Sequence, residues 1–221
     1  MNKIKFAAWS GILSLILYVF AFNLELNAIV ETLLMFLATI TSATFAYGFY
    51  LIAQKEKNKR LMKASLILIV LTFVVFLMNT FLPSNYAFEF DEIYFVVESF
   101  AGFSLYTLKL FAMGLVVMLF GRALLTLKKY GRIAKWAGIL EIICGTSSIV
   151  LVVSIFFHLL RNDMLRSMIP DVLQAATTFV ALVTLVPAVI LSSLGFIVMV
   201  ISGIFATVLQ IILLFKAAKK V

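Results

Sequence analysis

Charged side chains are scarce in this sequence. Asp, Glu, Lys and Arg make up 13% of the 221 residues, whereas 64% are hydrophobic, and the mean hydropathy is +1.17. Soluble domains carry about 25% charged and roughly 45–50% apolar residues. Because a chain so poor in charge could not cover its core with a polar surface, we expect an integral membrane protein.

Cysteine and histidine each occur once, as Cys144 and His158. A lone cysteine excludes an intramolecular disulfide and a CxxC redox pair. A lone histidine excludes a bis-His haem within one chain and a His-rich zinc site. We therefore expect neither a cofactor nor a metal.

Catalytic motifs are missing as well. The sequence contains no GxxxxGK[ST], HExxH, GxSxG or DxxD-type pattern. A Cys144–His158 dyad is excluded because the two residues are expected at opposite sides of the membrane. We therefore expect that the protein is not an enzyme.

What the sequence does contain is long apolar segments separated by short connectors. Transmembrane strands would alternate apolar and polar residues over about ten positions, whereas these runs are unbroken and reach roughly 20 residues. The runs predict an all-α, polytopic transmembrane bundle in a single integral membrane domain, 1–221. Its seven helical segments cover approximately 6–22, 29–53, 61–82, 93–127, 134–160, 172–190 and 194–215.

The connectors differ in charge. Residues 54–63 carry five Lys or Arg and one Glu, and residues 127–135 carry four Lys or Arg. The connectors 23–28 and 83–92 are acidic, and 161–171 is balanced. Basic loops stay in the cytoplasm. We therefore expect a cytoplasmic N-terminus in the inner (plasma) membrane.

The net charge of +8 follows from this asymmetry. It indicates attraction to anionic lipid of the inner leaflet, so the lipid bilayer, and no nucleic acid, is the expected partner of the basic loops.

The C-terminal run leaves the number of crossings open. From 172 to 215 there is no charge in 44 residues, about twice the length that one span needs. Two spans would place the terminal lysines outside, against the charge rule. A re-entrant or interfacial segment over 172–190, broken near Pro187 and 192–195, is the alternative. The bundle thus has six or seven full crossings. The first segment also fits a signal peptide, but its length favours an uncleaved span.

Ionisable side chains inside the apolar segments are expensive, which makes them candidates for function. Lys109 is placed about 20 Å from the inner boundary at Arg122. Its side chain cannot quite reach the outer surface by snorkelling, so it needs a partner or water. We expect a pair with Glu31, linked through water to Glu98 and His158.

Glu141 lies in the inner half of the membrane, five residues after the interfacial Trp136. Its expected partners are Arg122 and the basic loop. Two interpretations stay open: a structural ion pair, or a proton or cation site that faces the cytoplasm. Ala134 and Gly138, four residues apart, predict a close helix contact on the same segment.

The stretch GLVVMLFGRALLTLKKYGRIAKWAGILEIICG (114–145) resembles a bacterial family of multi-span membrane proteins of unknown function. The matching residues lie in and between two spans: Gly114, Leu115, Gly121, Arg132, Gly138 and Gly145. VPAVI (186–190) resembles the last span of that family. The chain lacks a proline before Arg132 and a His early in the fourth span. The resemblance implies a multi-span fold and no particular activity.

Two functions fit the sequence. The first is binding or translocation of a small solute through an outer-facing polar cavity formed by Lys109, Glu31, Glu98 and His158, where Lys109 favours an anionic group. The second is a non-catalytic membrane subunit, scaffold or sensor. Such a protein would bind a membrane protein partner, or its own copies, through its helices.

Overall fold

A computed structural model describes residues 2–23, 27–81, 100–159 and 171–219. This part of the chain contains helices and no strand. The helices are α1 (Lys3–Asn23), α2 (Ala28–Lys55), α3 (Lys59–Phe81), α4 (Phe100–Leu124), α5 (Arg132–Leu159) and α7 (Asp171–Lys219), with a short 3-10 helix, η1 (Lys128–Tyr130), between α4 and α5.

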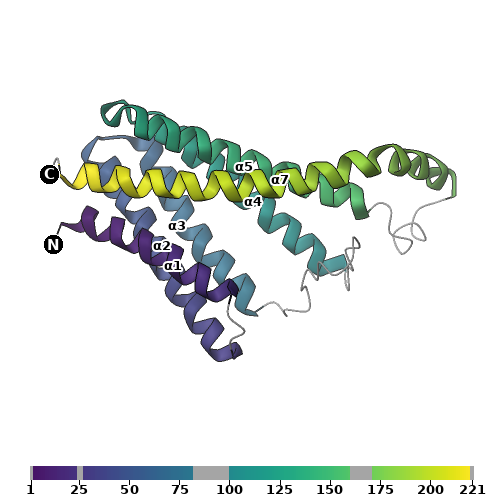
Figure 1. Ribbon diagram of the computed structural model, residues 1–221, viewed down its shortest axis with the longest axis horizontal. Coiled ribbons are helices and arrows are strands. Elements are labelled where there is room, and N and C mark those ends of the chain that lie inside the picture. Colours follow the sequence, from purple (N-terminus) through teal and green to yellow (C-terminus); the bar gives the residue numbers. More distant parts are fainter. Residues whose placement is uncertain (1, 24–26, 82–99, 160–170, 220–221) are drawn as a thin grey trace.

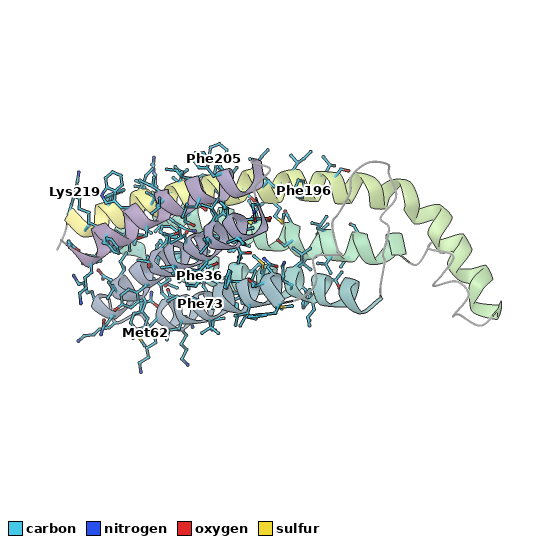
Figure 2. The ribbon with its side chains drawn as sticks, turned by 90° about the horizontal axis from the view of Figure 1, so that it is seen from below. Phe36, Met62, Phe73, Phe196, Phe205 and Lys219 are labelled. Atoms are coloured by element: carbon cyan, nitrogen blue, oxygen red, sulfur yellow. The ribbon has the colours of Figure 1, made fainter. Side chains whose placement is uncertain are left out.

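Each of the six long helices contains a stretch that is long and apolar enough to cross a membrane. These stretches are Lys3–Phe20, Ile29–Lys55, Lys59–Phe81, Thr107–Leu124, Arg132–Ser154 and Ser193–Lys219. Large apolar side chains cover their outer surfaces; Phe205, for example, is 59% exposed and points outward from α7 (Figure 2). The prediction of an all-helical, multi-pass membrane protein is confirmed in these terms.

The six helices form a ring in which each packs against its neighbours in sequence. The closing contact is made by α7, which packs against α5 on one side and α1 on the other. The N- and C-termini lie at the same end of the bundle (Figure 1). The α2–α3 and α4–α5 connectors lie at this end too, and we call it the basic end. It gathers Lys3, Lys5, Lys55, Lys57, Lys59, Arg60, Lys63, Arg122, Lys128, Lys129, Arg132, Lys135, Lys216 and Lys219.

The two C-terminal segments expected at 172–190 and 194–215 are one continuous helix of 49 residues, α7, so the count of seven segments is not confirmed. At about 1.5 Å per residue this helix is about 73 Å long, more than twice the hydrocarbon thickness. Its first part extends past the other helices and curves (Figure 1). The helix runs through Pro187 and Gly195, two residue types that weaken a helix interior without always ending it.

The buried core lies near the basic end. Its largest fully buried side chains are Phe49, Phe120, Ile52, Leu61, Leu124, Leu213 and Leu214. In α3 the buried residues Leu61, Ala64 and Ser65 all fall in the first two turns. Away from this end, the ribbon of α1–α3 diverges from that of α4, α5 and α7 (Figure 1). Among the described residues, the largest buried side chains therefore gather near the basic end.

Glycines set the distance between α4 and α5. A Cβ atom at Gly121 would lie 2.7 Å from the carbonyl oxygen of Gly138, and a Cβ atom at Gly138 would lie 2.7 Å from that of Gly121. Gly114 and Gly145 face each other in the same way one heptad away. The two backbones touch, as small residues allow between membrane helices. This confirms the close helix contact predicted at Gly138.

A methyl group at Gly121 should therefore force α4 and α5 apart. We expect Gly121→Ala to lower the free energy of unfolding by about 1–3 kcal/mol, because the new atom meets backbone that cannot rotate away. Thermal unfolding in detergent measures this. Gly195→Ala is the matched control: its Cβ would lie 3.7 Å from the nearest atom, so it should be neutral or slightly stabilising. Equal unfolding temperatures for the two variants would contradict the close contact.

Candidate functional site

Lys109 lies in the third turn of α4, in the half of the bundle remote from the basic end. Its Nζ atom donates a hydrogen bond of 2.6 Å to Oδ1 of Asn79, near the end of α3. The lysine side chain is partly buried. An ammonium and a carboxamide from two helices thus meet near the ends of their apolar stretches, Thr107–Leu124 and Lys59–Phe81.

The residues expected around Lys109 are placed differently from the prediction. Glu31 lies in the first turn of α2, is exposed, and is not a contact of Lys109 in the described part of the chain. Near a helix N-terminus its carboxylate is favoured by the helix dipole. His158 belongs to the last turn of α5, but its side chain lies outside the described residues. Glu98 lies outside them altogether.

Glu141 of α5 lies at the junction of three helices. Its Oε1 atom accepts a hydrogen bond from Nε2 of Gln210 on α7, and Gln210 is only 3% exposed. On the other side, a Cβ atom at Gly121 of α4 would lie 2.8 Å from the Cβ atom of Glu141. The close approach of α4 and α5 therefore brings α4 directly against this glutamate.

Arg122 is the partner that the sequence predicts for Glu141. The described residues do not show this pair. Arg122 is exposed on α4. It lies one residue beyond Gly121, a rotation of about 100° around the helix, so its side chain leaves the junction. The carboxyl of Glu141 meets a neutral amide in place of a guanidinium.

Further sulfur and hydroxyl groups lie between α5 and α7. Ser148 is buried, and its Oγ atom lies 3.0 Å from the Sδ atom of Met199. A Cβ atom at Gly203 would lie 3.4 Å from the Sγ atom of Cys144. The contact between α5 and α7 thus contains polar atoms at several positions along the two helices.

The sequence analysis did not predict Asn79 as the partner of Lys109 or Gln210 as the partner of Glu141. Both are carboxamides within apolar stretches, and Gln210 is the sole carboxamide in 194–215. That feature was visible in the sequence. A search for all polar residues at membrane depth, rather than for charged ones, would have found both.

The basic end carries a third polar group, at the connectors. Nζ of Lys129 lies 2.8 Å from Oε1 of Glu56, which joins the α4–α5 connector to the α2–α3 connector. Nδ2 of Asn58 donates to Oγ1 of Thr126 at 2.6 Å, between the same connectors. The hydrogen bond and the charge of Glu56 raise the pKa of Lys129 above its ordinary value of 10.5. A pocket of about 230 Å³ lies here, lined by Glu56, Asn58, Thr126, Leu127, Lys128 and Lys129.

In the part of the chain that the structure describes, no three His, Cys, Asp or Glu side chains gather in one place. The chemistry that these polar groups can perform is hydrogen bonding and proton binding. Lys109 and Asn79 offer donors to an anionic group, and Glu141 offers a carboxyl.

The connector ion pair leads to a prediction about alkaline pH. A raised pKa in the folded state means that the stabilisation by Lys129 is complete below 10.5 and is lost as the pH rises through the folded pKa. Lys129→Gln should thus lower the unfolding temperature slightly at neutral pH, and the difference from the parent protein should close in strong alkali. Lys135→Gln, at an exposed position, serves as the control. A difference that grows with pH would contradict the assignment.

Comparison of the chain with protein-family models, with curated proteins and with solved structures finds no match. The resemblance of residues 114–145 to a bacterial membrane family therefore stays an expectation. Functional inference rests on the polar groups described above.

Proposed function

We propose that this protein spans the inner (plasma) membrane and binds or translocates a small solute. The site is the polar region around Lys109 and Asn79, which opens toward the side opposite the basic end. The solute carries an anionic group, because an ammonium is the strongest attraction for such a group at this depth. The observation that carries the proposal is the 2.6 Å hydrogen bond between Lys109 and Asn79.

The donors at this site suit a carboxylate or a phosphate. The Lys109 ammonium has three N–H donors and the Asn79 amide has two, so both residues can donate to one oxygen-rich group. Because they come from α3 and α4, a bound anion would bridge the two parts of the bundle that diverge in Figure 1. The binding energy would then favour one relative position of α3 and α4.

The distribution of the core supports access from the end remote from the termini. Phe49, Phe120, Leu124 and Leu214 fill the interior near the basic end and are less than 2% exposed. Asn79 lies five turns of α3 away from the buried Leu61. A solute that entered from the basic end would have to displace these close-packed side chains.

The orientation in the membrane follows from charge. In the basic end that we place in the cytoplasm, Glu56 is the one acidic residue beside the many lysines and arginines. Anionic lipid of the inner leaflet attracts such a surface by about 1 kcal/mol per Lys or Arg. The basic connectors and both termini then lie inside, with six crossings.

Solute binding is tested by thermal unfolding in detergent with a panel of small carboxylates, phosphates and sulfate. An anion that binds should stabilise the parent protein by about 2.7 kcal/mol at a hundred times its Kd. Lys109→Met should abolish this stabilisation, and Lys63→Met, which removes a lysine at the basic end, should retain it.

Without ligand, we expect Lys109→Met to be neutral or stabilising, within about 1 kcal/mol, because a functional charge is held at a stability cost. A loss of the order of 3–5 kcal/mol would show instead that Lys109 is half of a buried pair. That outcome would contradict the proposed solute site and favour a membrane subunit that binds a partner protein.

The orientation is tested with single cysteines in a Cys144→Ser background. Lys128→Cys, in the α4–α5 connector, should react with a membrane-impermeant maleimide only after the membrane is opened. Asn27→Cys, just before α2 at the other end, should react in intact cells. The reverse pattern would place the basic end outside.

A further inference from the structure

Glu141 is the one acidic residue of α5, and the proposed binding of a solute at Lys109 does not involve it. It lies nine residues after Arg132, the first residue of α5, so it is about 13 Å from that end of the helix. This depth is inside the hydrocarbon region, where an ionised side chain costs roughly 2.5–3.5 kcal/mol. A residue kept at such a cost calls for an explanation of its own.

The groups that face Glu141 are neutral. From α7 comes the carboxamide of Gln210, and from α4 comes Gly121, with Arg122 turned outward and exposed. On α5 itself, Cys144 lies one turn away and Ser148 two turns away. Among the described residues no cation faces the carboxyl, so the ionised form lacks the partner that a buried carboxylate requires.

Gln210 can satisfy Glu141 in either protonation state. Toward a carboxylate, the amide donates from Nε2, as the structure shows. Toward a carboxylic acid, the amide turns over and its Oε1 atom accepts a hydrogen bond from the acid O–H group. No other group has to move when the proton binds or leaves. This property distinguishes a proton site from an ion pair, which loses its bond when the carboxylate is protonated.

We infer that Glu141 is a proton-binding site within the membrane, with Gln210 as its hydrogen-bond partner in both states. Proton binding replaces a charge-assisted bond between α5 and α7 with a neutral one, which is about half as strong. The proton therefore weakens the contact between α5 and α7 near the packed end of the bundle. The inference is independent of the solute that Lys109 binds.

Dicyclohexylcarbodiimide tests the inference on the full-length protein in detergent, because it enters apolar regions and reacts with protonated carboxyl groups. We expect the adduct at Glu141, located by mass spectrometry, to form in acid and at neutral pH. Its yield should fall roughly tenfold for each pH unit above the midpoint. The variant Glu31→Gln, which changes an exposed carboxylate, should leave the adduct unchanged.

The partner variant adds a readout that a purely structural role would not move. Gln210→Leu removes the donor that favours the ionised form, so the midpoint of labelling should shift to higher pH. As a second measurement that needs no reagent, the infrared band of a protonated carboxylic acid should be present in the parent protein and lost in Glu141→Gln.

Two results would overturn the inference. One is a parent protein with neither the adduct nor the infrared band at any pH at which it is folded. The other is protection from labelling that saturates with sodium at constant pH, which would make this a metal-cation site. The labelling experiment contains no solute, so a negative result would not contradict the proposed anion site at Lys109. In the same way, a failure to detect anion binding would not contradict the proposed proton site at Glu141.

Discussion

The contact between the backbones of Gly121 and Gly138 is the constraint on which the rest of the structure depends. Each glycine would place a Cβ atom 2.7 Å from the carbonyl oxygen of the other, so the backbones of α4 and α5 are in contact. This contact lies at the level of Glu141, whose Cβ atom would be 2.8 Å from a Cβ atom at Gly121. It fixes Glu141 against α4 on one side and turns it toward Gln210 of α7 on the other.

Two intramembrane ionisable groups are bonded to carboxamides from neighbouring helices. Lys109 meets Asn79 and Glu141 meets Gln210. An opposite charge would bind the carboxylate of Glu141 more strongly, but it would also favour the ionised form of that group. An amide supplies a donor or an acceptor without fixing the protonation state. Gln210 thus satisfies the carboxyl of Glu141 without a counter-charge from the described residues.

The sequence predicted the helices well and their partners poorly, for a physical reason. Runs of about 20 apolar residues can only be helices in a lipid bilayer, so the spans followed from composition. The partner of Lys109 depends on which helices are neighbours in the ring. The partner of Glu141 depends on the register of α5 against α7. Lipid-facing and protein-facing surfaces are equally apolar here, so no pattern in the sequence marked those faces. The continuity of α7 through Pro187 was hidden for a similar reason, since neighbouring groups decide whether a proline ends a helix.

The two candidate groups are too far apart to act on each other through space. Lys109 and Gly121, which marks the level of Glu141, are twelve residues apart on α4, or about 18 Å. At an effective dielectric constant of about 20, two charges at this distance interact by about 1 kcal/mol. Any stronger interaction between the two groups would have to pass through the helices that carry them, and α4 and α5 are in contact at their glycines.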